Sequence, residues 1–194
     1  MIRAMGHPAD RIHLMQGSLA DWESFGGPIE TGPKDALKTD NLDYSRNVSY
    51  VSQDTSSTVN MEDVMNIVTK GTKDSDAVIV DARSSGRFRG EVPEPRPGVR
   101  GGHMPGSLNV PFTDLLDDEN PSKFRPQIEL KAVFDKAGVD IGTEKRIVCS
   151  CGSGVTACAV AIALEECGRN PSETFIYDGS WIEWGMDSQT PVVL

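Results

Sequence analysis

The sequence lacks several features that would each indicate a particular class of protein. No apolar run approaches the roughly 20 residues that a membrane-spanning helix needs, and the first residues, Met1 to His7, have no apolar core of the kind found in secretion signals. Basic residues are few, since 19 Lys and Arg stand against 29 Asp and Glu, for a net charge of −10. This balance disfavours nucleic acid and anionic membrane surfaces as partners, and we expect neither.

Cysteine is scarce too, with residues only at positions 149, 151, 158 and 167. The spacing is not that of a zinc site, because Cys158 and Cys167 fall inside a predicted helix without paired ligands. We therefore expect no metal and no cofactor. Few cysteines and no secretory features indicate reduced thiols in a cytoplasmic or mitochondrial protein.

What is present is an alternation of strand-like and helix-like segments. The pattern predicts strands at residues 77–80, 107–110, 146–149 and 175–177, and helices at 61–68, 128–137 and 157–164. A short edge strand at 48–51 is a further expectation. Alternating strands and helices predict an α/β fold with a central parallel sheet flanked by helices. Sheets of this kind place their functional sites at the carboxyl ends of the strands.

Cys151 lies where a predicted strand meets a predicted helix, and it opens the loop Cys151-Gly152-Ser153-Gly154-Val155-Thr156. Backbone N–H groups at such a turn favour an anion, and the glycines let the loop close tightly. A free thiol with a pKa of about 8.5 is only about 3% ionised at pH 7, so a decrease of about two units makes most of it thiolate. The pattern predicts a nucleophile, although a small buried structural cysteine is the alternative.

An internal repeat relates the two ends of the chain. Gly6, Gly17, Ser18 and Trp22 recur as Gly168, Gly179, Ser180 and Trp184 at a constant offset. Each copy has the pattern of a helix end, a short strand, a Gly-Ser turn and an aromatic anchor. The chain therefore resembles a tandem of two domains from which most of the first is missing. We expect a remnant of the first domain at 1–33, a linker at 34–57 and a catalytic domain at 58–194.

Five motifs carry a resemblance to a known family. In chain order they are Asp81-Ala82-Arg83, Gly86-Arg87-Phe88-Arg89-Gly90, Gly102-His103-Met104-Pro105-Gly106-Ser107, the Cys151 loop, and Tyr177-Asp178-Gly179-Ser180-Trp181. Together they resemble the second domain of the tandem rhodanese family, in its 3-mercaptopyruvate sulfurtransferase branch. The resemblance covers roughly residues 45 to 191, and it implies a rhodanese-like three-layer fold.

The resemblance also implies an activity and a site. Cys151 would take sulfur from 3-mercaptopyruvate, release pyruvate, and pass the sulfur from its persulfide to cyanide or to a thiol acceptor such as thioredoxin. Ser153 would be the second catalytic residue, bonding the sulfur or relaying a proton. The residues implied in substrate binding are Arg87, Arg96, Gly152, Gly154, Val155 and Thr156.

Arg87 and Arg96 flank a Pro-rich loop that is too stiff to be a flexible linker. Two guanidinium groups suit the carboxylate and carbonyl of a 2-oxo acid. The alternative for either residue is a solvated surface ion pair. We interpret Arg89 as structural.

Other candidates are interpreted as structural. Asp81 and Arg83 should form a buried pair at a strand end, and His103 should fix a turn, with a general-base role as the alternative. Trp181 and Trp184 should pack in the core. Cys149 is expected on the opposite face of its strand from Cys151, buried and inert.

Three alternative functions remain to be compared. A cysteine phosphatase of this fold would have His at position 150 and Arg at 157, where this chain has Ser150 and Ala157, so phosphoryl transfer is disfavoured. A thiosulfate sulfurtransferase usually has basic loop residues, and Gly152 and Ser153 are neutral; this favours mercaptopyruvate without excluding thiosulfate. A rhodanese-like interaction module, or a fragment with little turnover, is the third. In the resembling family an Asp of the first domain completes the site, and the chain has no matching motif, so we expect single-turnover sulfur uptake with low steady-state activity.

Overall fold

The structure, a computed structural model, describes residues 9–32 and 57–194 and divides into two units, Met1–Asp54 and Thr55–Leu194. The described part of the first unit contains the 3₁₀ helix η2 (Ala9–Arg11) and the helix α1 (Leu19–Ser24). Ser18 caps α1, because its hydroxyl accepts the Asp21 N–H at 3.3 Å while the Asp21 carboxylate accepts the Ser18 N–H at 2.7 Å.

The internal repeat is only partly reproduced in structure. Residues 12–17 form no strand, in contrast to the prediction, because a strand needs a hydrogen-bonded neighbour and residues 9–32 supply none. Trp22 is 41% exposed, whereas Trp184 is fully buried. The predicted strand at 48–51 and most of the predicted linker lie outside the described residues, so the domain boundaries stay predictions.

The second unit is an α/β domain built on one parallel sheet. Its strands run in the order β1-β5-β4-β2-β3, and every neighbouring pair is parallel. The strands are β1 (Thr58–Val59), β2 (Ala77–Asp81), β3 (Leu108–Asn109), β4 (Arg146–Ser150) and β5 (Thr174–Tyr177). The helices are α2 (Met61–Asp74), α3 (Ser85–Phe88), α4 (Gln127–Lys136), α5 (Ala157–Glu166) and α6 (Ser180–Met186), with the 3₁₀ helices η5 (Phe112–Leu115) and η6 (Pro171–Glu173).

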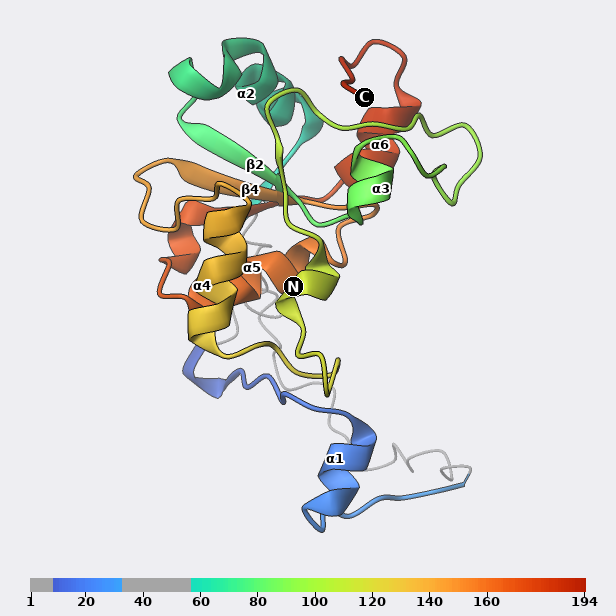
Figure 1. Ribbon diagram of the computed structural model, residues 1–194, viewed down its shortest axis with the longest axis vertical. Helices are drawn as coiled ribbons and strands as arrows, with labels where there is room; N and C mark the ends of the chain where they lie inside the picture. Colours follow the sequence, from blue (N-terminus) through green and yellow to red (C-terminus); the bar gives the residue numbers. More distant parts are fainter. Residues whose placement is uncertain (1–8, 33–56) are drawn as a thin grey trace, which may run out of the picture. The chain divides into compact units, whose positions relative to one another are not determined.

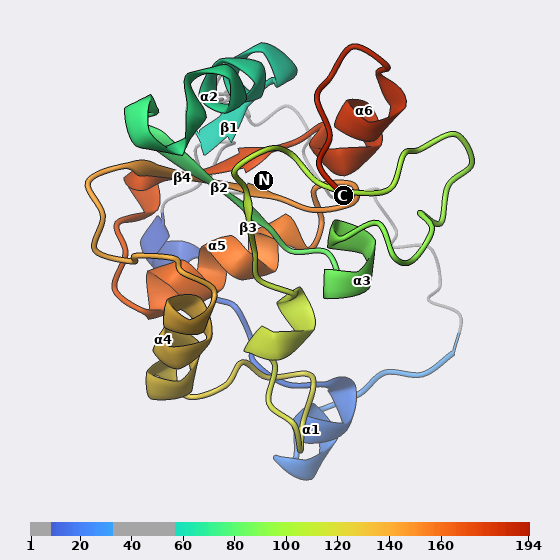
Figure 2. The same ribbon diagram turned by 45° about the horizontal axis from the view of Figure 1, so that its top comes forward.

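Helices cover both faces of this sheet. In Figures 1 and 2, α2 and α6 lie on one side of the strands, and α4 and α5 lie on the other. The expected three-layer fold with a central parallel sheet is thus confirmed. No helix in residues 9–32 or 57–194 combines the length and apolarity needed to cross a membrane.

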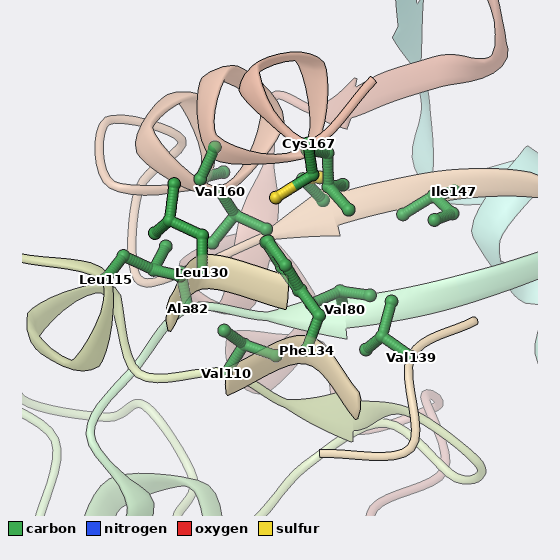
Figure 3. Packing of buried hydrophobic residues seen from close by; sticks show 14 of the residues in the cluster. Val80, Ala82, Val110, Leu115, Leu130, Phe134, Val139, Ile147, Val160 and Cys167 are labelled. Atoms are coloured by element: carbon green, nitrogen blue, oxygen red, sulfur yellow. The ribbon is translucent and has the colours of Figure 1, made fainter. Parts of the chain in front are cut away.

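Each face of the sheet has its own apolar core, and strand alternation assigns the residues to them. Ile147 and Cys149 of β4 pack with α4 and α5, whereas Val148 packs with α2 and α6. Figure 3 shows Phe134 of α4 and Val139 packed against Val80 of the sheet in the first core. Trp181 and Trp184 are fully buried in the second, which confirms their predicted core role.

One prediction about the strand faces is wrong. Cys149 and Cys151 belong to the same core, on the α4 and α5 side, and not to opposite faces. The physical reason is the period of two along a strand, which returns residues two apart to one face. Cys149 is buried, as expected.

The strands and helices predicted between residues 61 and 177 are present, whereas several short elements were not predicted. Asn60 caps α2 by accepting the Asp63 N–H at 3.0 Å, and Gly138, with φ 77°, follows the end of α4. Cys167 is the residue just after α5 and not inside it. The two-residue strand β1 and the four-residue helix α3 were not predicted.

Candidate active site

The Cys151 loop joins the carboxyl end of β4 to the start of α5. β4 lies in the middle of the sheet, between β5 and β2, so the loop emerges among the ends of neighbouring strands. Cys151 is 2% exposed, and its Sγ accepts the backbone N–H of Gly154 at 3.1 Å. The loop thus folds back so that one of its own backbone N–H groups donates to the thiol of its first residue.

The surroundings of Cys151 favour its thiolate. Burial by itself raises the pKa of this thiol, but hydrogen bonds from the Thr156 side chain and from the backbone N–H groups of Ser153, Ala157 and Thr156 outweigh burial. The net pKa of Cys151 lies below the ordinary value for cysteine. Cys149 shows the opposite case, because burial without such donors raises its pKa far above the ordinary value.

Gly152 and Gly154 let the cysteine loop pack closely against Arg87 and Asp178. A Cβ at Gly152 would lie 3.0 Å from Nη2 of Arg87. At Gly154, where φ is 87°, a Cβ would lie 3.2 Å from the carbonyl oxygen of Asp178. The first glycine lets a guanidinium approach the loop, and the second permits a left-handed backbone against the segment after β5.

The predicted site residues come together at one cavity of about 230 Å³. It is lined by Cys151, Gly152, Ser153, Val155, Thr156, Arg87 and Arg96, together with Glu94, Pro95, Val99 and Ile182. Gly154, the remaining predicted residue, does not line the cavity and is buried within the loop. Ser153 is exposed, and its hydroxyl makes no hydrogen bond to a described residue, so the loop does not use this hydroxyl for its own backbone.

Glu94 is a site residue that the sequence analysis did not single out. Its carboxylate, 4% exposed, accepts Arg83 Nη1 at 2.9 Å and Arg87 Nη2 at 2.5 Å. Arg87 Nε also donates to it, at 3.2 Å. Glu94 therefore fixes the direction of the Arg87 guanidinium and compensates part of its charge. Its position between two prolines, in a loop flanked by arginines, was the available signal.

The residues interpreted as structural have structural partners. Arg83 and Asp81 form a buried ion pair at 2.6 Å, and the Arg83 guanidinium lies 4.1 Å from the centre of the Trp181 ring. Nδ1 of His103 lies 2.9 Å from the carbonyl oxygen of Phe88, and the two rings stack. Arg89 pairs with Glu91 at the surface, at 2.8 Å.

Ser180 belongs to the fifth motif, but the sequence analysis did not predict its contact with the cysteine loop. Although fully buried and distant in sequence, its hydroxyl accepts the backbone N–H of Cys151 at 3.2 Å. The same hydroxyl donates to the carbonyl of Tyr177 at 2.8 Å. Ser180 thus links the end of β5 to the start of the cysteine loop.

A loop of backbone donors around one cysteine, at the carboxyl edge of a parallel sheet and beside two arginines, defines an α/β protein with a candidate thiolate site. A model of the Rhodanese-like domain matches residues 65–187. The chain therefore belongs to the rhodanese family.

The chain is also similar to curated proteins that are named as sulfurtransferases. The chain is 38% identical over 191 residues to the 3-mercaptopyruvate sulfurtransferase of Mus musculus, covering 97% of this chain and 57% of that protein. It is 34% identical over 201 residues to the mitochondrial thiosulfate/3-mercaptopyruvate sulfurtransferase 1 of Arabidopsis thaliana, with 99% and 51% covered.

A solved structure matches in the same way. The crystal structure of SseA from Escherichia coli, presented as the rhodanese fold of 3-mercaptopyruvate sulfotransferases, matches with a TM-score of 0.54 at 37% identity, over 68% of this chain and 44% of that one. The chain spans only about half the length of these relatives.

Proposed function

We propose that the chain transfers sulfur from 3-mercaptopyruvate through a persulfide on Cys151. The observation that carries the proposal is the cavity itself, in which a thiol of lowered pKa faces Arg87 and Arg96. The similarity to proteins named 3-mercaptopyruvate sulfurtransferase supports the choice of donor.

In the first step the Cys151 thiolate attacks the sulfur of mercaptopyruvate. A bond forms between the two sulfur atoms, the carbon–sulfur bond breaks, and its electron pair stays on the carbon. That carbon takes the proton that the donor thiol gives up, so pyruvate leaves and the enzyme holds a persulfide anion. In the second step an acceptor thiolate or cyanide attacks the outer sulfur, and Cys151 returns as thiolate.

Loop donors suit both ends of this cycle. The N–H groups of Ser153 and Gly154 stabilise negative charge on Cys151 before attack, and charge returns to that sulfur when the acceptor takes the persulfide. The Ser153 hydroxyl, open to the cavity, is suited to bond the donor sulfur or to relay its proton.

The arginines suit the oxygen atoms of the donor. Arg96 is exposed and makes no ion pair in the described part of the chain, so its guanidinium is available to a carboxylate. Arg87 is held by Glu94 through Nε and Nη2, which leaves its Nη1 side for the substrate. Because Glu94, which is shared with Arg83, compensates part of the Arg87 charge, the cavity is better suited to a monoanion than to a dianion.

Thiosulfate is the second candidate donor, supported by the name of the Arabidopsis relative. A further alternative function is that of a rhodanese-like interaction module with little turnover. A thiol acceptor such as thioredoxin, and a cytoplasmic or mitochondrial location, belong to the same proposal. The free state of all four cysteines is compatible with such compartments.

The direct test is the mass of the protein after incubation with mercaptopyruvate. We expect one added sulfur on the wild type and none on Cys151→Ser. Sulfur on Cys149, Cys158 or Cys167 would contradict the assignment.

The role of the arginines is tested by kinetics. Arg96→Ala should lower kcat/KM about 10- to 150-fold, because it removes a charge-assisted contact of about 1.5 to 3 kcal/mol. The matched control is Arg89→Ala, which removes a surface arginine outside the cavity.

A further inference from the structure

Ser180 adopts a backbone conformation that its residue type disfavours. Among the described residues it is the one non-glycine residue with positive φ, at 50°. It is also fully buried, at the first position of α6. A strained conformation is retained where the surrounding structure requires it, and such residues cluster at functional sites.

The start of α6 makes three hydrogen bonds to the start of the cysteine loop. The Ser180 hydroxyl accepts the N–H of Cys151 at 3.2 Å. The next two backbone N–H groups, of Trp181 and Ile182, donate to the carbonyls of Cys151 at 2.9 Å and Gly152 at 3.0 Å. Both carbonyls at the start of the loop therefore point toward α6.

Because peptide groups are planar, the hydrogen bonds from α6 to the loop carbonyls also set the direction of the loop N–H groups. In a trans peptide the C=O of one residue and the N–H of the next point in opposite directions, and the described residues contain no cis peptide. With the Gly152 carbonyl bonded to α6, the Ser153 N–H must point away from α6. The Ser153 N–H is one of the backbone groups that lower the pKa of the Cys151 thiol. The next N–H along the loop, that of Gly154, donates to the Cys151 sulfur at 3.1 Å.

We infer that Ser180 is a positioning residue for Cys151. By accepting the Cys151 N–H and setting the start of α6 against the loop, it keeps the loop N–H groups aimed at the sulfur. This inference rests on the proposed role of Cys151 as a thiolate nucleophile.

α6 is itself held firmly enough to serve as a support. Its tryptophans are fully buried, and Trp181 Nε1 donates to the carbonyl of Arg100 at 2.8 Å. At its other end, Arg100 Nη2 donates to the carbonyls of Trp184 at 3.2 Å and Asp187 at 2.5 Å. The element that orients the loop is thus fixed at both ends.

The test compares Ser180→Gly with Ser180→Ala. Both variants remove the hydroxyl and leave the buried Cys151 N–H without its acceptor, but glycine adopts positive φ freely whereas alanine does not. We expect both variants to raise the apparent pKa of Cys151 by about half a unit or more. Because only the thiolate reacts, the alkylation rate at neutral pH should fall about threefold or more below that of wild type. Both variants should lower the melting temperature, and Ser180→Ala should lower it further than Ser180→Gly because alanine disfavours the positive φ.

Ser150→Ala is the matched control, since Ser150 is a buried serine beside Cys151 whose hydroxyl has no hydrogen-bond partner in the described structure. The pKa of Cys151 in the Ser150→Ala variant should equal that in the wild type. A wild-type pKa in either Ser180 variant would overturn the inference, because the hydroxyl would then not be required. If Cys151 of the wild type itself titrated like a free cysteine, the proposed function would fail instead, so the two failures are distinguishable without measuring turnover.

Discussion

At the scale of single residues, the cysteines show how the same thiol acquires opposite properties. Cys151 and Cys149 are both buried, and burial alone raises a thiol pKa. The difference is the ring of N–H and hydroxyl donors around Cys151, which lowers its pKa, whereas Cys149 has none to offset burial. Cys158, although exposed as a residue, also has a raised pKa, chiefly because its thiol is partly buried.

This contrast predicts a pH-dependent selectivity. In the native protein, iodoacetamide near pH 7 should label Cys151 before the more exposed Cys158, with the rate at Cys151 rising through a midpoint below that of free cysteine. Peptide mass mapping after timed quenching measures both. In urea all four cysteines should react alike. Faster labelling of Cys158 in the native state would contradict the donor arrangement.

The same shift has a consequence for stability, with a definite sign. The folded pKa of Cys151 lies below the unfolded one, so its ionisation stabilises the fold. That contribution is complete above the unfolded thiol pKa, at roughly 8.5. It is lost as the pH falls through the lower pKa of the folded state.

At the scale of elements, the Pro-rich loop after α3 is fastened by one buried carboxylate. Glu94 in the loop bonds Arg83, which follows β2, and Arg87, which lies in α3. Arg83 is itself anchored to Asp81 and to the carbonyl of Gly102. The loop that carries Arg96 is therefore connected to the sheet through this ion network.

Glu94→Ala should loosen that loop and destabilise the domain. The substitution leaves the buried Arg83 without one of its carboxylates, and we expect a loss of about 1.5 to 3 kcal/mol in the free energy of unfolding. Urea titration measures it, and hydrogen exchange should rise in residues 90–98. The control is Glu91→Ala, which removes the exposed surface pair with Arg89 and should leave the urea midpoint unchanged. Equal midpoints for the two variants would show that the network contributes no stability.

The predictability of the elements follows their length and burial. The sequence identified β2, β4 and β5 because runs of β-branched and aromatic residues fill a buried strand. It identified α2 and α4 because a cap or a following glycine marks their ends. β1 and α3 were missed because elements of two and four residues have too little pattern, and tertiary hydrogen bonds define them.

The site follows the same rule. The loop from Cys151 to Thr156 was predictable because its donors are local in sequence, from the thiol to the start of the helix. Glu94 and Ser180 were not, because their roles depend on contacts with Arg83 and with Cys151 that only the folded sheet creates. Local chemistry was predictable, and the residues that hold it in place from elsewhere in the chain were not.

At the scale of the whole molecule, the site and both cores belong to one unit. Every residue lining the cavity lies between Arg87 and Ile182, and both apolar cores fall within residues 59–192. The parallel order of the strands explains this concentration, because it brings the carboxyl ends of β2, β4 and β5 to one edge of the sheet. Residues 58–194, the predicted catalytic domain, thus contain both apolar cores and every residue that lines the cavity.

We therefore expect the second unit to fold and to accept sulfur without the first. A chain starting at Thr55 should unfold cooperatively, because a domain with its own apolar cores is stable by itself. Its Cys151 should have the pKa measured in the full chain and should gain one sulfur from mercaptopyruvate at the same single-turnover rate, since the loop, Arg87, Arg96 and Ser180 are all retained. Thermal unfolding, alkylation against pH and intact mass, each compared with the full chain, measure these properties. A non-cooperative transition, or a higher Cys151 pKa in the shortened chain, would show that residues 1–54 contribute to the core or to the site.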